Sequence, residues 1–195
     1  MEQFQVVSGG VAAAKGFQTA STAAGIKYKD RPDMAMIYSE QDCRLAGTFT
    51  TNVVKAAPVL WDKALVEGGK CARAVVINAG IANACTGKEG MDYCKQTAEC
   101  CGEVLNIPED SVLVASTGVI GMQLPMDRIC GGIRAMAPEL APGLDSGAKA
   151  AKAIMTTDTK PKEAAVRLQF GGKTVTIGGM SVSYTHLRAH ETAAN

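Results

Sequence analysis

Short apolar runs, separated by glycine, proline and charged residues, mark the segments that this sequence predicts to be strands. The clearest is Ala72–Asn78, whose β-branched run is typical of a strand covered on both faces. Met34–Tyr38 is a second short run, and we expect it to pair antiparallel with Leu45–Thr51. Two glycines separate Ala164–Phe170 from Lys173–Ile177, which predicts a β-hairpin.

Apolar residues at three- and four-residue spacing predict four helices along the same chain. The helices are expected at Val59–Gly68, Gly87–Asn106, Asp127–Met136 and Asp145–Met155. Two other segments have the composition of loops. Phe17–Gly25 is small and polar, and Lys27–Asp33 is a charged stretch that we expect to be a solvated connector.

The stretch Ser111–Gly121 (SVLVASTGVIG) combines a strand signal with groups that can act on a substrate. Its apolar start predicts a buried strand, and the step into Ser116, Thr117 and Gly118 predicts a tight turn. Gly118 lets the backbone approach a ligand closely, and Thr117 adds a hydroxyl beside it. Backbone N–H groups and a hydroxyl aimed at one point make an oxyanion hole. From these residues alone, an ordinary strand-to-loop turn remains the alternative.

Composition narrows the classes of partner. At 195 residues the chain is long enough for one domain or two small ones with a sizeable core. Its 20 basic and 19 acidic residues give a net charge of +1, which offers no electrostatic case for nucleic acid or an anionic membrane. Aromatic residues make up 5% of the chain, so base-stacking surfaces are not expected.

Seven cysteines bear on the cellular compartment. Their number is odd and no Cys-x-x-Cys pair occurs, which indicates free thiols rather than a disulfide framework. The first five residues contain neither a basic nor an apolar signal region, and no run approaches the ~20 apolar residues of a membrane helix. We therefore expect a cytoplasmic protein.

Four motifs follow one another in a fixed order and spacing. They are Gly47–Asn52 (GTFTTN), Asn78–Gly87 (NAGIANACTG), Ser116–Gly121 (STGVIG) with Leu124–Asp127 (LPMD), and Ala153–Thr159 (AIMTTDT). Together they resemble the ornithine acetyltransferase (glutamate N-acetyltransferase) family of arginine biosynthesis. The resemblance runs from about Gly9 to Met180, so residues 1–180 are expected to form a region like the α-chain of that family.

The resemblance implies an α/β fold with layered sheets between helices. The implied activity is acetyl transfer from N2-acetylornithine to glutamate through a threonine acetyl-enzyme. The oxyanion hole maps to Thr117 and Gly118, and Thr156 matches a substrate-contacting threonine. The implied partner is a β-chain, in an αβ hetero-oligomer formed when the precursor cleaves itself. No metal and no cofactor are implied, while acetyl-CoA, which some members use, is left open as a co-substrate.

The last fifteen residues, 181–195 (SVSYTHLRAHETAAN), differ in kind from the rest. Family members continue after Gly-Gly-Met with a lysine-bearing segment and then an Ala-Thr bond, where the precursor cleaves. Here Val182 replaces the lysine and no Ala-Thr follows. His186 and His190 suit one helix face, but no third ligand is near, so a metal site is not expected. We interpret 181–195 as a non-native tail, and we expect a chain truncated before its nucleophile to be inactive alone.

Two other functions remain open from the residues. One is a stand-alone module that binds small amino acids or their acetylated forms without catalysis. The other is a hydrolase that uses Cys85 as nucleophile. No histidine outside 181–195 could activate Cys85, so we expect it to be a small buried residue instead. Asn78 and Asn83, which flank a tight segment, are expected to satisfy backbone groups.

Overall fold

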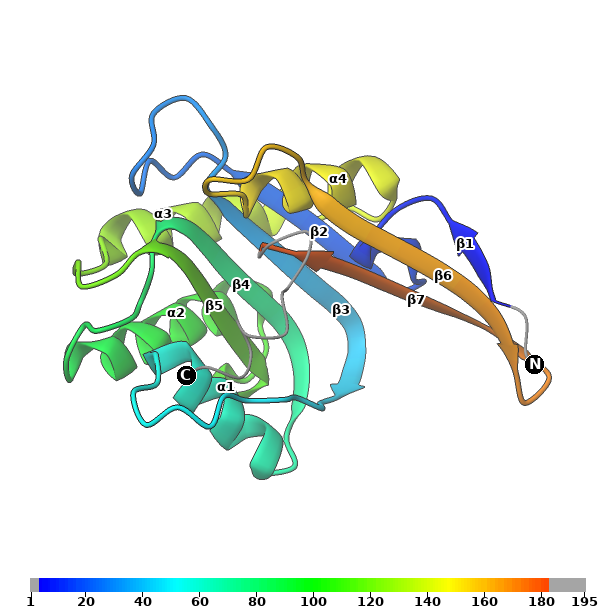
Figure 1. Cartoon of the computed structure of the whole chain (residues 1–195), viewed down its shortest axis with the longest axis horizontal. Helices are drawn as coiled ribbons and strands as arrows, with labels where there is room; N and C mark the ends of the chain where they lie inside the picture. The colour runs from blue at the N-terminus through cyan, green and yellow to red at the C-terminus, as the bar shows by residue number, and fades with distance from the viewer. Residues whose placement is uncertain (1–3, 183–195) are drawn as a thin grey trace.

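The computed structural model describes residues 4–182, which form two β-sheets and four helices (Figure 1). The strands are β1 (Gln5–Val7), β2 (Phe17–Thr22), β3 (Met34–Arg44), β4 (Cys71–Ile81), β5 (Val112–Val119), β6 (Lys162–Phe170) and β7 (Lys173–Ser181). The helices are α1 (Ala57–Glu67), α2 (Glu89–Leu105), α3 (Met126–Met136) and α4 (Leu144–Ala153). This is the mixed α/β architecture that the sequence predicts.

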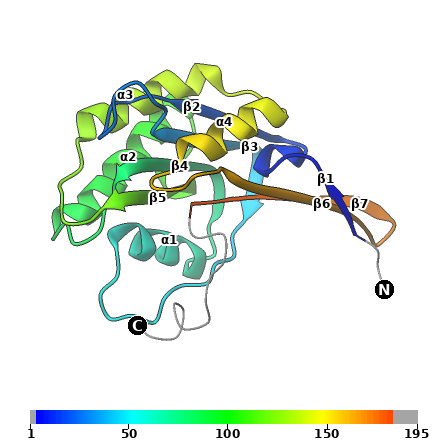
Figure 2. The same cartoon turned by 45° about the horizontal axis from the view of Figure 1, so that its top comes forward.

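The larger sheet has the strand order β2-β3-β4-β5. β2, β3 and β4 pair antiparallel, whereas β4 and β5 are parallel, and the connection between them contains α2. The smaller sheet has the order β1-β6-β7 and is antiparallel throughout. Figures 1 and 2 show β6 and β7 extending away from the larger sheet, with β1 beside β6.

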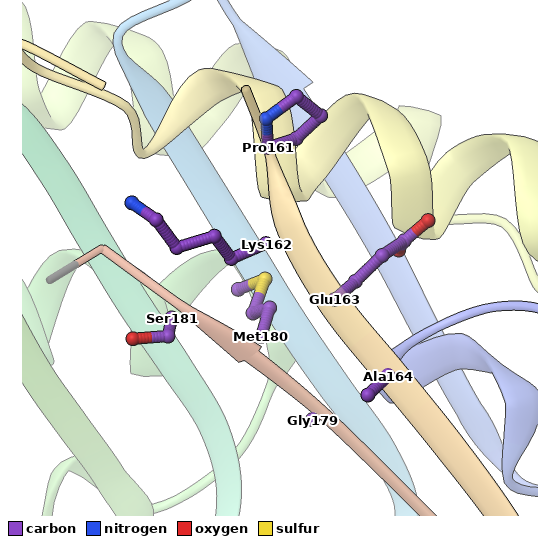
Figure 3. A pocket seen from close by; sticks show the side chains of 7 residues that line it. All are labelled: Pro161, Lys162, Glu163, Ala164, Gly179, Met180 and Ser181. Carbon is purple, nitrogen blue, oxygen red and sulfur yellow. The ribbon is translucent and has the colours of Figure 1, made fainter. Parts of the chain in front are cut away.

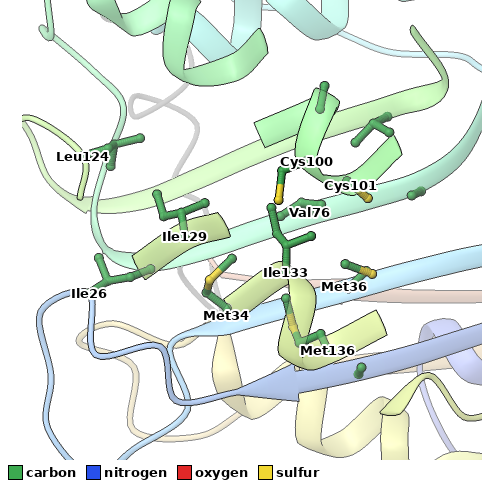
Figure 4. Close-up of a cluster of buried hydrophobic side chains, with 14 of the residues drawn as sticks. Ile26, Met34, Met36, Val76, Cys100, Cys101, Leu124, Ile129, Ile133 and Met136 are labelled. Atoms are coloured by element: carbon green, nitrogen blue, oxygen red, sulfur yellow. The ribbon is translucent and has the colours of Figure 1, made fainter. Parts of the chain in front are cut away.

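Successive side chains of a strand point to opposite faces, so the strands of the larger sheet present apolar residues on both faces. Helices cover both of these faces. On one face, Met34, Met36 and Val76 pack against Ile133 and Met136 of α3 and against the cysteines of α2 (Figure 4). Burial raises the pKa of the Cys101 thiol to about 12, so it stays protonated as a small apolar group.

On the opposite face, α4 packs on the sheet through small side chains. Ala150, Ala153 and Ile154 form a second buried cluster with Ala35 of β3 and Ile77 of β4. Small residues on both sides let helix and sheet approach closely. Met180 and Val182, at the end of β7 and just after it, pack against the same cluster.

The strand prediction was right for β4, β5, β6 and β7 and for Met34–Tyr38, which lies within β3, but wrong about the partner of β3 and about β2. Phe17–Gly25, predicted to be a loop, contains β2, and the predicted ribbon with Leu45–Thr51 does not form, because that segment lies outside the strands. β3 instead lies between β2 and β4. The small polar residues of β2 look like a loop in sequence, but Thr19 and Ala20 are buried here, where α4 packs against β2.

The free edge of β5 is covered by two side chains of α1 rather than by another strand. The indole N–H of Trp61 donates to the carbonyl oxygen of Val112 at 3.0 Å, and Asp62 Oδ1 accepts from the backbone N–H of Val114 at 3.0 Å. Covering an edge strand in this way prevents it from pairing with another chain. It also holds the strand that leads to Thr117 and Gly118.

Replacing Asp62 with asparagine is expected to stabilise the chain above pH 6. Burial raises the pKa of Asp62 to about 6, although the Val114 hydrogen bond lowers it. Folding therefore favours the protonated acid, and ionisation costs stability as the pH rises from about 4 to 6. Asparagine keeps the acceptor and removes the charge. Since Asp62 is only half-buried, we expect a gain of ~1–2 kcal/mol at pH 8, after discounting for solvent.

Urea denaturation at pH 4 and pH 8 measures this gain as a change in the free energy of unfolding. The matched control is Asp30→Asn, at an exposed loop position. A gain at pH 8 that is equally large at pH 4 would contradict the proposed cause, because the two forms of Asp62 would then not differ in stability.

Candidate functional site

The segment with Thr117 and Gly118 is the end of β5, where it runs parallel to β4. Thr117 pairs with Ala79 and Gly118 with Gly80, and the pairing continues to Val119. The tight turn predicted at residues 116–118 is therefore wrong, since the strand continues through them and ends at Val119. The site still lies at the carboxyl end of parallel strands, where ligands bind in open α/β sheets.

Gly118 is in contact with the backbone of β4. Its φ is +133°, and a Cβ atom placed on it would lie 2.2 Å from the carbonyl carbon of Gly80 and 2.7 Å from the nitrogen of Ile81. Only glycine fits such an approach without moving a strand. The sequence predicted that the missing side chain of Gly118 lets the backbone approach a ligand closely, and the structure shows a close approach to β4.

Hydrogen bonds fix the segment that follows β4 against β5. The hydroxyl of Ser116 accepts from the N–H of Asn83 at 2.8 Å and donates to the carbonyl oxygen of Ile81 at 3.2 Å. The Asn78 amide donates to the Ile81 carbonyl at 2.7 Å, and the Asn83 amide donates to that of Gly90 at 2.8 Å. Both asparagines are buried, so the prediction that they satisfy backbone groups is confirmed.

Thr156 lies in the turn between α4 and β6. Its backbone N–H donates to Asp158 Oδ2 at 3.2 Å, and Asp158 also forms an ion pair with Lys162 at the start of β6. Burial raises the pKa of Asp158, but the hydrogen bond from Lys162 contributes to a net lowering. The anionic carboxylate therefore ties the turn to β6 and fixes the backbone of Thr156.

The structure brings the β5 and α4 candidates to the same face of the larger sheet. Thr117 shares a face with Ala115 because side chains alternate along a strand. Ala115 packs against the cluster that contains Ile154, two residues before Thr156. A hollow of about 490 Å³ opens nearby, between the start of β6 and the end of β7. Figure 3 shows Lys162 and Met180 among the residues that line it.

A loop that sequence reasoning treated as a solvated connector also borders this end of the sheet. Tyr28 lies next to Gly80, with ring atoms 3.3 Å from a Cβ placed there. The guanidinium of Arg31 stacks 4.0 Å from the Tyr28 ring centre and donates to the carbonyl oxygen of Met155. The loop thus links the partner of Gly118 to the residue before Thr156.

The buried anchor of this loop is Asp33, which is 0% exposed. Its two carboxylate oxygens accept from the N–H groups of Ala24 and Ile26, each at 2.7 Å. The prediction of a solvated connector is wrong at this residue. A carboxylate just before a fully apolar strand start, after Pro32, was the available signal, because such a residue is well placed to bond the turn that precedes it.

Cys85 is exposed and has a φ of +55°, so the prediction that it is buried is wrong. It follows the tight segment after β4, where the chain turns toward α2. Among residues 4–182, no three His, Cys, Asp or Glu side chains are grouped to hold a metal ion. No helix in the described part is both long and apolar enough to cross a bilayer. His186 and His190 lie outside the described residues.

Comparison with known proteins gives a consistent result. The model of the ArgJ family matches residues 18–182. The arginine biosynthesis bifunctional protein ArgJ of Symbiobacterium thermophilum is 50% identical over 177 residues, which are 90% of this chain and 43% of that protein. The chloroplastic ArgJ of Oryza sativa is 41% identical over 90% of this chain and 38% of its own length. The chain thus spans less than half the length of these relatives.

Two solved structures have the same fold. The crystal structure of ArgJ from Bacillus halodurans superposes with a TM-score of 0.87 at 35% identity, covering 96% of this chain and 97% of that one. The crystal structure of ornithine acetyltransferase from Mycobacterium tuberculosis, in complex with ornithine, has a TM-score of 0.85 at 39% identity, covering 95% of this chain and 98% of that one.

Proposed function

Because the chain belongs to the ArgJ family, we propose that it is the N-terminal portion of an enzyme that transfers an acetyl group from N2-acetylornithine to glutamate. The observation that carries the proposal is the meeting of three segments on one face of a sheet. Ala115 of β5, two residues before Thr117, Ile154, two residues before Thr156, and Met180 near the end of β7 all belong to or adjoin one buried cluster. The M. tuberculosis relative crystallised with ornithine supports this class of substrate.

In the proposed reaction, a threonine supplied by the C-terminal portion attacks the acetyl carbonyl of N2-acetylornithine. The hydroxyl proton passes to the amine of the same threonine, and the carbonyl oxygen becomes an oxyanion. Thr117 donates its hydroxyl and Gly118 its N–H to that oxygen. Ornithine leaves with the proton, and glutamate then takes the acetyl group from the threonine by the reverse steps. Thr156 contributes to substrate binding.

A two-chain mature protein is part of the same proposal. This chain spans 43% of the Symbiobacterium relative, yet 97% of the chain solved for the Bacillus relative. The solved chain is therefore close in length to this one and much shorter than the relatives that are matched in sequence. That length supports an α-chain of about this size that pairs with a separate β-chain. Residues 181–195 as a non-native tail remain part of the proposal, with Ser181 the last residue of β7.

This polypeptide alone is proposed to be inactive, since the nucleophile lies in the other portion. It needs no resident cofactor, and acetyl-CoA is a candidate co-substrate only. A cytoplasmic location is proposed from its seven cysteines, all of which are free thiols. The rice relative is a chloroplastic form.

Replacing Thr117 with valine is expected to lower the rate of acetyl transfer by the assembled pair about a hundredfold, because one oxyanion-hole donor contributes on the order of that factor to the rate. Binding of N2-acetylornithine should change little, because the hydroxyl stabilises the oxygen chiefly once it becomes an oxyanion. Valine matches the shape of threonine and suits a strand, so the fold is preserved. Initial rates of the co-purified pair measure the loss, and NMR titration of this chain with N2-acetylornithine shows whether the amide resonances of Thr117, Gly118 and Thr156 shift.

The matched control is Thr176→Val, another half-buried strand threonine, on β7. Shifts confined to other regions would overturn the proposed site. An unchanged transfer rate in Thr117→Val, with the expected shifts, would remove only the role of its hydroxyl.

A further inference from the structure

The outer face of the three-stranded sheet is an apolar surface that nothing in the described part of the chain covers. Cross-strand partners share a face, so the register β1-β6-β7 brings Val6, Val166 and Ile177 into one row and Leu168 and Val175 into the next. Phe170 completes this face at the hairpin end of β6. We call these six residues the outer face.

This face is exposed to a degree that is unusual for such side chains. Val6 is 72%, Ile177 57% and Phe170 64% exposed, and all three lie on one continuous surface. Scattered apolar residues need no explanation, but a contiguous apolar face marks an interaction site. The opposite face behaves differently, because Ala165 is 2% exposed there and Gly178 lies against the backbone of Gly10.

The edge of the same sheet is also free. β7 is the last strand in the order β1-β6-β7, so one of its two edges has no strand partner within residues 4–182. It is nine residues long and contains no proline, and its only charged residue is Lys173. Folded proteins normally protect an edge of this kind, and β5 of this chain is protected by α1. A second polypeptide could cover the apolar face and pair with the open edge of β7.

We propose that the outer face is the docking surface for the C-terminal portion of the mature protein. This inference rests on the proposed two-chain function. The relatives contain more than an equal length of additional sequence, since the match covers 43% of the Symbiobacterium protein. The family match ends at residue 182, directly after β7, so the additional polypeptide of the relatives follows this strand. This C-terminal polypeptide therefore begins beside the three-stranded sheet, whose outer face is uncovered within residues 4–182.

Docking on this face also positions the site. Ile177 lies at the middle of β7, on the outer face. Met180 lies three residues further along the strand, on the opposite face, where it packs against the cluster beside Ala115 and Ile154. A partner seated on the hairpin and continuing along β7 therefore reaches the end of β5 and the turn with Thr156. The β6–β7 hairpin, which extends from the larger sheet in Figures 1 and 2, would thus hold the C-terminal portion beside the candidate site.

The test is co-expression of this chain, carrying an affinity tag, with the untagged C-terminal portion of the Symbiobacterium relative. We expect the two polypeptides to purify together. Ile177→Lys and Val6→Lys, which place a charge on the outer face, are each expected to reduce recovery of the partner at least tenfold. Both positions are exposed, so folding is kept and is checked by circular dichroism. The control is Val54→Lys, because Val54 is 70% exposed but lies in the loop before α1.

Recovery of the partner by each variant tests the docking surface separately from the two-chain function. Recovery by all three variants would overturn the docking surface and leave the two-chain function intact. Loss in Val54→Lys as well would overturn it too, because the effect would not be specific to the face. No recovery by the unsubstituted chain would overturn both the surface and the two-chain function. A dimer of this chain alone that Ile177→Lys dissociates in sedimentation equilibrium would assign the face to a second copy and overturn the proposal.

Discussion

Gly118→Ala is expected to lower the free energy of unfolding by ~3–5 kcal/mol. The new Cβ would lie 2.2 Å from the carbonyl carbon and 2.3 Å from the oxygen of Gly80, and these are backbone atoms that no side-chain rotation can move. β4 and β5 must therefore separate locally, which costs ~1–3 kcal/mol as overpacking does. A φ of +133° adds a similar cost for any residue with a side chain.

Gly121→Ala separates the two causes. Gly121 has a φ of +78° with nothing within 4 Å of an added Cβ, so its alanine variant carries backbone strain without a clash. We expect it to lose only ~1 kcal/mol. Urea denaturation of both variants measures the difference. Equal losses would show that the approach of β5 to β4 relaxes freely, and would remove the steric argument for glycine at this position.

Asp33→Ala is expected to cost ~3–4 kcal/mol and to loosen the loop that borders the site. Its carboxylate satisfies the buried N–H of Ile26 and the partly buried N–H of Ala24. Alanine leaves both donors without a partner, and each buried unsatisfied group costs ~1–3 kcal/mol. Tyr28 and Arg31 lie in the same loop, so their contacts with Gly80 and Met155 should weaken as well.

Denaturation gives the stability, and hydrogen exchange at Ala24 and Ile26 reports the local effect. Asp92→Ala, on the exposed side of α2, is the control and should cost well under 1 kcal/mol. If the amides of Ala24 and Ile26 keep their protection in Asp33→Ala, the carboxylate is not what orders the loop.

The elements that sequence predicted best are those with a strong local signal. The α2 region has clear helical spacing, Ala72–Asn78 contains the β-branched run Val75–Ile77, and the glycine pair after Phe170 marks a hairpin. In each case the local pattern and the tertiary environment agree. Where they disagree, prediction failed: β2 is rich in small polar residues, and its neighbours β3 and α4 make it a strand.

The candidate site divides in the same way. The residues came from motifs, and the resemblance of those motifs to a family is confirmed by the family match. The geometry was not available from sequence, because it depends on contacts between distant segments. The approach of Gly118 to Gly80 needs the β4–β5 register, and the hydrogen bond from Arg31 to Met155 joins residues more than a hundred positions apart. The roles of Thr117, Gly118 and Thr156 stay predictions.

The outer face could not be predicted from the sequence, because it also depends on contacts between distant segments. Val6 and Ile177 are far apart along the chain and become neighbours only through the register of β6 with both β1 and β7. Apolar residues in a strand normally predict burial, and here several of them are exposed. Such a conflict between composition and exposure indicates a surface that another polypeptide covers.

The most direct test of the account is acetyl transfer from N2-acetylornithine to glutamate. It would be measured for this chain alone, for the C-terminal portion of the Symbiobacterium relative alone, and for the two co-purified. We expect transfer by the pair and none by either polypeptide separately. Transfer by this chain alone, or none by a stably assembled pair, would contradict the claim that it supplies one half of an acetyltransferase site.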